Sequence, residues 1–294
     1  MPVPLTTILI IAADSGPSLR ECVASALASS VPVEILLVDN ASRDGVPQAV
    51  DRACASDERV RVIYNHANLG FGPAVNLGAR QAHGNALLVL NPDCMLEPDT
   101  LARMLDMVHA HPEAGVVGAV VCDEDGLPDP ASRRRDPLLR RSLNAMTGRA
   151  KREADGAQYE GVDVAGPIPE SVVDVENVSG AIMLLPRSVF DRLNGFDEGY
   201  FLHCEDLDLC RRARDAGYKV LLAGNVRVRH AGGGSSAHRP VFVSYHKHRG
   251  MWRWFRKFDP AARKPLTGAL VACGIAAHFL ATAPLLALRR AGRH

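Results

Sequence analysis

The chain has 294 residues, of which 47% are hydrophobic and 23% are charged; this composition is ordinary for a globular protein and excludes a disordered one. Its 34 lysines and arginines nearly balance 33 aspartates and glutamates, so the charge gives no reason to expect a nucleic-acid partner. The seven cysteines are scattered without a Cys-x-x-Cys pair, which favours reduced thiols in a cytoplasmic chain over a disulfide framework or a zinc site. The N-terminus runs straight into an apolar segment and lacks the basic region and cleavage site of a secretory signal.

The first ninety residues alternate strand and helix patterns. A continuous apolar run predicts a strand at 7–13, and further strands are expected at 33–38, 60–64 and 86–90. Helical spacing predicts a helix at 19–29 with Ser18 as its N-cap, and further helices are expected at 47–55 and 72–82. This alternation predicts an α/β fold with a doubly wound, mostly parallel sheet. Because ligands bind beyond the carboxyl ends of such strands, Asp39 and Asp93, which follow the second and fourth strands, are expected at one crevice.

The middle of the chain has a weaker pattern. Segment 123–161 is rich in Asp, Pro and Arg and predicts a loop, either solvated or mobile with its cations facing a diphosphate or an anionic membrane. Beyond it we expect a strand at 178–185, a helix after Pro186, a helix at 206–216, and strand-like segments at 219–223 and 226–230. We therefore predict a catalytic domain over 1–236 and a helical C-terminal segment over 237–294.

The C-terminal segment has the composition of a membrane-associating appendage. Residues 251–258 mix both tryptophans with cations, as membrane-interface segments do. Residues 268–288 carry no formal charge and are long enough for a span, which takes about 20 apolar residues, but they are rich in Ala and contain Pro284. A helix on the membrane surface is the favoured interpretation, and a true span or docking against the domain remain open. This predicts a protein peripheral to the cytoplasmic face of the inner membrane.

Polar residues at the strand ends are candidates for ligand binding. Asp39 can bond a ribose or a base, although an Asp there also forms turns. The loop containing Asn68 and Gly70 opens a helix and offers backbone N–H groups to an anion, although two glycines alone are weak evidence. The turn Asn91-Pro92-Asp93 can hold a divalent cation against a diphosphate, and it can equally be an ordinary Asx-Pro turn.

A run of acids near residue 205 is the candidate for proton transfer. Glu205, Asp206 and Asp208 stand at a predicted helix start, where acids also serve as caps. On a helix Asp206 and Asp208 face different directions, so they are not expected to share one task. Crowded carboxylates beside a metal site can deprotonate an acceptor hydroxyl. His230, at a strand end before a glycine-rich segment, is either structural or a metal ligand.

Taken together, these segments resemble the family 2 glycosyltransferases of the GT-A fold over roughly residues 7–236. The resemblance rests on three regions: Leu37-Val-Asp-Asn-Ala-Ser-Arg-Asp-Gly, Asn68-Leu-Gly-Phe-Gly-Pro-Ala-Val-Asn-Leu-Gly, and Val178-Ser-Gly-Ala-Ile-Met-Leu-Leu-Pro-Arg with the later Gly195-Phe-Asp-Glu and Glu205-Asp-Leu-Asp-Leu-Cys-Arg-Arg. Within the family, the Asn-Pro-Asp turn and the Phe-Leu-His-Cys-Glu-Asp-Leu-Asp run look most like bacterial rhamnosyltransferases, which move L-rhamnose from dTDP-rhamnose to polyprenyl-linked or cell-surface glycans.

The resemblance implies a role for several positions of this chain. Asp39 is expected to contact the base or ribose of the nucleotide, with Asn68, Gly70 and Asn91 also on the donor side. Asp93 matches the last acid of the family's Asp-x-Asp motif, so it and His230 are expected to bind Mg²⁺ or Mn²⁺. Asp206 is expected to act as the base in an inverting displacement, with Glu205 as its rival. Arg212 is expected near the diphosphate, and Arg211 is equally placed by sequence.

Two departures and three alternatives accompany this interpretation. Asn91 replaces the first acid of the Asp-x-Asp motif, which leaves more of the metal coordination to Asp93 and His230, and the first strand ends in Ala12-Ala13-Asp14-Ser15 where many relatives carry another sequence. A UDP-hexose is the alternative donor. A sugar nucleotidyltransferase is disfavoured because 14–17 supplies no basic glycine-rich loop, and a non-catalytic membrane-associated module is disfavoured because the acids and His230 are intact.

Overall fold

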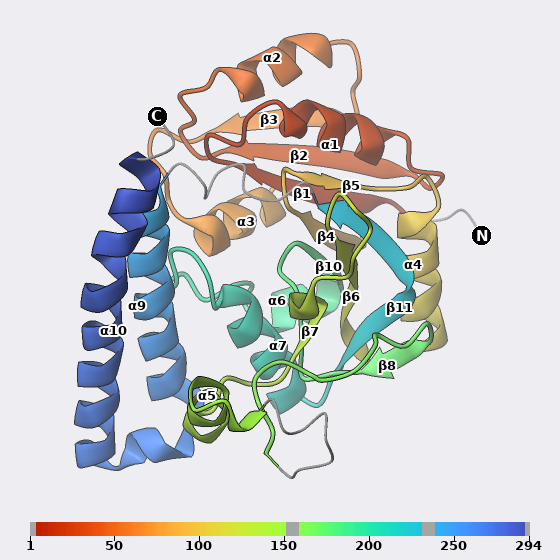
Figure 1. Cartoon of the computed structure of the whole chain (residues 1–294). Coiled ribbons are helices and arrows are strands. Elements are labelled where there is room, and N and C mark those ends of the chain that lie inside the picture. Colours follow the sequence, from red (N-terminus) through yellow and green to blue (C-terminus); the bar gives the residue numbers. More distant parts are fainter. Residues whose placement is uncertain (1–3, 151–158, 231–238, 292–294) are drawn as a thin grey trace.

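A nine-stranded mixed sheet forms the centre of the computed structural model, which describes residues 4–150, 159–230 and 239–291 (Figure 1). The strand order is β3-β2-β1-β4-β10-β6-β11-β5, with β8 paired to β11. The strand bounds are β1 Thr6–Ala12, β2 Val33–Asp39, β3 Val60–Tyr64, β4 Ala86–Leu90, β5 Cys94–Met95, β6 Ala114–Cys122, β8 Val172–Asp174, β10 Ile182–Pro186 and β11 Lys219–His230.

The sheet is mostly parallel, as predicted. Strands β1 to β4 pair in parallel, and β10 enters between β4 and β6 antiparallel to both. Every residue of β1, β4 and β6 is buried, because both faces of the sheet are covered. The four predicted N-terminal strands are confirmed to within one residue at each end.

Helices cover the two faces of the sheet, and side chains alternate between them along each strand. Ile8 and Ile10 of β1 join the core under one layer, whereas Leu9 and Ile11 join the core under the other. The first layer is formed by α1 Ser18–Leu27, α2 Val46–Ala53 and α4 Thr100–Ala110, and the second by α3 Phe71–Ala79, α6 Arg187–Arg192 and α7 Glu205–Asp215. This architecture confirms the predicted doubly wound α/β class.

Three local predictions need correction. Ser18 is the first residue of α1 and Pro17 its N-cap, so Ser18 does not cap the helix. The strand expected at 178–185 is divided into β9 Asn177–Val178 and β10, which are separated by a turn at residues 179–181. The two segments expected at 219–223 and 226–230 form the single strand β11, whose pairing with β6 shifts register between Ala223 and Arg227.

The basic segment 123–161 is not simply a loop. Its described part contains a 3₁₀ turn at Pro130–Ser132, strand β7 at Arg133–Arg134 and helix α5 at Leu139–Met146, while residues 151–158 lie outside the described part. Arg141 is buried and its guanidinium donates to Glu160 and Glu176. Sequence reasoning treated these cations as solvated or as facing a ligand because their acidic partners are 19 and 35 positions away.

The C-terminal segment is a helical hairpin of α9 Pro240–Phe258 and α10 Pro265–Ala291, joined by a 3₁₀ turn at Pro260–Arg263 (Figure 1). Trp254 is fully buried against Tyr200, Cys204 and Leu207. The expectation that 251–258 is a membrane-interface segment is therefore wrong for Trp254, which packs on the catalytic domain. Between Pro265 and Leu288, α10 is long and apolar enough to cross a membrane by length and composition, and none of its most apolar window is buried.

Candidate active site

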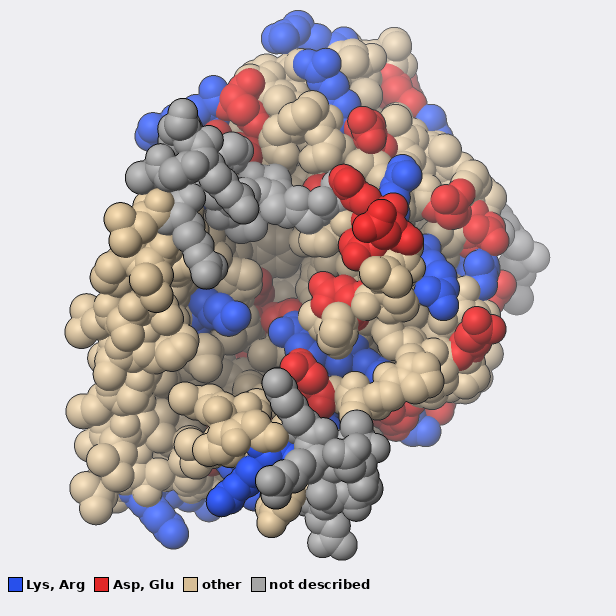
Figure 2. Space-filling model, in the orientation of Figure 1, with Lys and Arg blue, Asp and Glu red and all other residues tan. Residues whose placement is uncertain are grey.

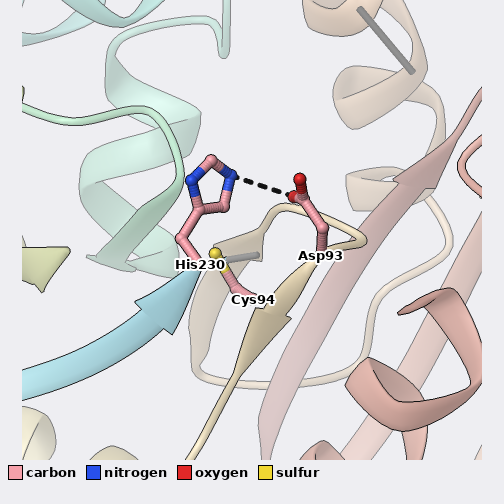
Figure 3. A group of neighbouring side chains, drawn as sticks. All are labelled: Asp93, Cys94 and His230. Atoms are coloured by element: carbon pink, nitrogen blue, oxygen red, sulfur yellow. Dashed lines mark ion pairs between the residues drawn. The ribbon is translucent and has the colours of Figure 1, made fainter. Parts of the chain in front are cut away.

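The turn after β4 and the end of β11 meet in a carboxylate–imidazole pair. His230 pairs with Cys94 in the short antiparallel contact of β11 with β5, which places its ring beside the preceding residue, Asp93. Figure 3 shows the two side chains facing each other, and the His230 Nε2 to Asp93 Oδ1 distance is 3.0 Å. The hydrogen bond that His230 donates to Asp93, against the opposing effect of burial, raises the pKa of His230. Two residues 137 positions apart are thus brought together at the carboxyl edge of the sheet.

These residues fit a hard divalent cation. The ligand atoms of Asp93, Cys94 and His230 lie within 4.8 Å of one another. The Cys94 thiol donates to the carbonyl of Ala181, and burial, reinforced by the charge of Asp93, raises its pKa well above the ordinary range. Mg²⁺ and Mn²⁺ prefer carboxylate oxygen and imidazole nitrogen to a protonated thiol. The donor set that suits either ion is therefore Asp93 and His230, the pair expected from the sequence.

The turn at residues 179–181 connects this pair to Asp206. On one side the Asn91 N–H donates to the carbonyl of Ala181 at 2.9 Å. On the other side the Gly180 N–H donates to Asp206 Oδ2 at 3.2 Å. A Cβ at position 180 would lie 3.1 Å from the Cβ of Asp206, so the turn and the helix start are closely packed. Asn91 and Cys94, which lie on either side of Asp93 in the sequence, therefore contact the same turn as Asp206.

Arg134 is a site residue that sequence reasoning missed. Its Nη2 atom donates to Asp206 Oδ2 at 3.0 Å, across 72 positions of the chain. Strand β7 makes this contact possible, because Arg134 pairs with Asn177 of β9 just before the 179–181 turn. The only available signal was the run of arginines at 133–135, which does not say which of them turns inward.

Glu205 and Asp208 occupy different environments from Asp206. Glu205 is buried, and its Oε2 has no hydrogen-bond partner within the described residues. Burial first, and then the charge of Asp206, raise the pKa of the Glu205 carboxyl well above its usual range. Asp208 is fully buried and pairs with Arg212 and with Lys257 of α9. Of the three acids, Asp206 is the one that contacts the 179–181 turn. The expectation that Asp206 and Asp208 face different directions is confirmed.

The start of α7 is held in an unusual backbone conformation. His203 and Cys204 have φ angles of 69° and 70°, a left-handed conformation that non-glycine residues adopt at a cost of roughly 1–3 kcal/mol each. Gly250 of α9 packs directly behind them, since a Cβ there would lie 2.7 Å from the carbonyl oxygen of His203. Helix α9 thus supports the strained turn that presents Asp206.

On the nucleotide side, Asn40 organises the residues expected there. Its Nδ2 donates to Asn68 Oδ1 and to the carbonyl of Gly70, both at 3.0 Å, and its Oδ1 accepts from Leu69 N. Asp39 is buried, and its Oδ1 accepts from the N–H of Ser42 at 2.9 Å. The structure brings Asp39, Asn40, Asn68 and Gly70 together at the ends of β2 and β3, and sequence reasoning had assigned no role to Asn40.

Gly70 and Arg212, both expected on the donor side, make close contacts within the fold. Gly70 has a φ of 91°, and a Cβ there would lie 2.6 Å from the carbonyl oxygen of Phe201, so close packing on the protein requires this glycine. Arg212 donates to Asp208, to the carbonyl of Leu193 and to that of Gly195. Each nitrogen of its guanidinium makes one bond within the fold, and the position of Arg212 near the diphosphate stays a prediction.

Figure 2 shows a hollow in one face of the molecule, with acidic and basic side chains gathered around it. A cavity of about 360 Å³ opens beside His230, lined by the end of β6 and the turn that follows it. The carboxylate–imidazole pair beside this cavity and the polar strand-end cluster lie at the carboxyl edge of a doubly wound sheet, which is where α/β enzymes bind their ligands.

Comparison with known proteins identifies the family. Glycosyl transferase family 2 matches residues 7–161. The chain is 33% identical to N-acetylglucosaminyl-diphospho-decaprenol L-rhamnosyltransferase of Mycobacterium tuberculosis, over 81% of this chain and 83% of that one. It is 27% identical to the rhamnosyltransferase WbbL of Escherichia coli, over 64% of this chain and 79% of that one. The chain belongs to glycosyltransferase family 2.

Solved structures share the fold. Mannosyltransferase PcManGT from Pyrobaculum calidifontis, in complex with GDP-Man and Mn²⁺, superposes with a TM-score of 0.61 at 19% identity and covers 99% of this chain and 79% of its own. GalNAc-T7 with UDP, GalNAc and Mn²⁺ superposes with a TM-score of 0.63 at 18% identity, over 91% of this chain and 51% of its own. The predicted GT-A fold is confirmed.

Proposed function

We propose that this chain is an inverting, divalent-metal-dependent rhamnosyltransferase, which moves L-rhamnose from dTDP-rhamnose to a lipid-linked or cell-surface glycan. The observation that carries the proposal is that the 179–181 turn contacts Asp206 on one side and, on the other, Asn91 and Cys94, the residues around the Asp93 that pairs with His230. The named rhamnosyltransferase relatives support the sugar, and the decaprenol-linked substrate named for one of them supports a lipid-linked acceptor.

Asp93 and His230 are the proposed ligands of Mg²⁺ or Mn²⁺. The chemistry that such an ion supplies when bound is neutralisation of the charge that develops on the leaving diphosphate. His230 must be neutral to donate its nitrogen lone pair to a metal, so the proton held in the His230–Asp93 pair has to leave on binding. Asp39, Asn68 and Asn91 are proposed to contact the nucleotide, and Asn40 keeps the loop around Asn68 in place.

Asp206 is the proposed general base. Its carboxylate receives hydrogen bonds from the N–H groups of Gly180 and Leu207 and from Arg134, so its plane is fixed relative to the turn. In the proposed step the carboxylate takes the proton of an acceptor hydroxyl while that oxygen bonds to the anomeric carbon, and the bond to the diphosphate breaks on the opposite face. Glu205 is the weaker candidate, because its raised pKa leaves it protonated near neutral pH and its side chain is buried.

The test is a donor screen by nucleotide release, with dTDP-rhamnose and UDP-hexoses, in the presence of Mn²⁺ or of a chelator. We expect release from dTDP-rhamnose only, and loss of activity on chelation. Asp206→Asn should lower the rate at least about a hundredfold. Asp215→Asn, the same change at the exposed end of α7, should leave it unaltered. Preference for a UDP-hexose would replace the donor, an active Asp206→Asn enzyme would exclude the base, and activity after complete chelation would exclude the metal.

We also propose that the protein works at the cytoplasmic face of the membrane. The apolar, exposed α10 supports this location, as does the lipid-linked substrate in the name of the mycobacterial relative.

A further inference from the structure

A basic pocket lies on the flank of α9, away from the residues proposed for catalysis. It has a volume of about 460 Å³ and is lined by Gly199, Arg249, Trp252, Arg253, Arg256 and Lys257. The four cations recur at helical spacing, so they share one side of the helix. None of them contributes to the metal pair, the 179–181 turn or the strand-end cluster.

Two of the four cations are already used within the fold. Arg253 and Lys257 both donate to Asp197 at 2.7 Å, and although burial opposes the effect, these bonds lower the pKa of Asp197 to about 2. Lys257 also donates to the buried Asp208 at 2.6 Å. The charges of Arg253 and Lys257 are therefore already balanced by acidic partners within the fold.

The other two cations are exposed and available. Among the described residues neither Arg249 nor Arg256 forms an ion pair, and the Arg256 guanidinium lies over the Trp252 ring at 5.7 Å. Trp252 in turn stacks on Phe255 with ring centroids 5.8 Å apart. The pocket thus combines two arginines with an aromatic ring that packs on the apolar core. Such a site suits an anion that lies at the border of an apolar phase.

The neighbouring helix supplies that boundary. Tyr245 and His248 of α9 contact Phe279 and His278 of α10, and Trp252 lies one turn beyond His248 on the same side of α9. The outer face of α10 carries five leucines that are each 59–74% exposed: Leu266, Leu270, Leu280, Leu285 and Leu288. In Figure 2 the outer side of the molecule, where Figure 1 shows α10, has almost only uncharged atoms.

We propose that the pocket binds the headgroup phosphate of an anionic phospholipid, while the leucine face of α10 lies in the membrane surface beside it. The charge of Arg249 and Arg256 complements the phosphate, and the adjacent apolar face accounts for the bilayer as its source. This arrangement fixes the orientation of the hairpin, and through the buried Trp254 also that of the domain, on the membrane. The proposed phospholipid site does not depend on the identity of the donor sugar.

The experiment compares binding of the full chain to vesicles of phosphatidylcholine alone and of phosphatidylcholine with phosphatidylglycerol. Arg249→Gln together with Arg256→Gln should lower partition onto the anionic vesicles roughly thirtyfold and leave partition onto the neutral ones unchanged. The matched control is Arg20→Gln with Arg80→Gln, which removes the same charge from exposed positions in α1 and after α3. The control should bind both kinds of vesicle as the wild type does.

A second readout reports on the pocket directly. The chain has two tryptophans, and Trp254 is buried. Phosphatidylglycerol brominated on its acyl chains should therefore quench the wild-type fluorescence through Trp252, and Trp252→Phe should abolish that quenching.

Equal loss of binding in the pocket variant and the control would overturn the proposal in favour of a diffuse charge effect. Unchanged binding of the pocket variant, or a concentration-dependent dimer that excludes vesicles, would overturn it as well. Nucleotide release by the pocket variant in detergent solution should match the wild type. If the wild type released no nucleotide from any sugar donor, the proposed function would be contradicted, and the vesicle-binding result would still test the lipid site.

Discussion

Replacing Glu205 by Gln should stabilise the fold and leave sugar transfer intact. Glu205 is buried with one oxygen unpartnered, and its raised pKa means that the folded protein keeps it protonated near neutral pH. The unfolded chain ionises the same group in the ordinary carboxyl range. A neutral glutamine of the same shape removes the penalty that this difference imposes on folding.

The magnitude follows from proton linkage. Between the ordinary pKa of a glutamate and the raised pKa in the fold, the folded state holds one proton more than the unfolded state. Stability therefore falls as the pH rises through this window, by about 1.4 kcal/mol for each pH unit between about 5 and 7. The glutamine side chain cannot titrate, so the Glu205→Gln variant should lack this component of the slope.

The assay is urea unfolding followed by the fluorescence of the buried Trp254, for both proteins at several pH values. The difference in unfolding free energy between variant and wild type should widen with pH in favour of the variant. Nucleotide release by Glu205→Gln should stay within a few-fold of the wild type, in contrast to Asp206→Asn. Parallel pH curves would refute the account of Glu205, and an inactive Glu205→Gln enzyme would transfer the role of base from Asp206 to Glu205.

Three further changes test the site and the fold. Asp93→Asn should raise the Mn²⁺ concentration for half-maximal activity by on the order of a hundredfold, and an unchanged metal titration would remove Asp93 from the ligand set. Arg134→Gln should lower kcat by up to about a hundredfold while the KM for the donor stays constant, because the carboxylate of Asp206 loses a positioning bond; a changed KM with constant kcat would argue against this role. Gly70→Ala should cost at least about 2 kcal/mol more unfolding free energy than Gly126→Ala, since both glycines have a left-handed φ but a Cβ meets atoms within 4 Å only at position 70. Equal losses in urea unfolding would contradict the packing argument.

The sequence predicts best what depends on local pattern. Strands β1 to β4 follow from predominantly apolar, β-branched segments, and the positions of Asp39 and Asp93 at one edge follow from the rule that ligands bind at the carboxyl ends of parallel strands. Even the divergence of Asp206 and Asp208 was predictable, because two positions on a helix differ by about 200° in direction.

What the sequence could not predict are contacts between distant segments. Arg134 reaches Asp206 through strand β7, a two-residue element inside a segment that resembles a loop in composition. Arg141 is buried because Glu176 and Glu160 neutralise it, and no local pattern indicates that pairing. The close packing of Gly70 on Phe201 was not predictable for the same reason, since the two residues are 131 positions apart.

The C-terminal hairpin shows how far such contacts join the catalytic domain to its appendage. The sequence separates them at residue 236, yet Lys257 bonds Asp208 on α7 and Gly250 packs behind the strained turn that begins this helix. The helix that presents Asp206 is therefore supported on one side by α9. The membrane surface proposed to hold α9 and α10 would therefore also orient the helix that presents the proposed base to a lipid-linked acceptor.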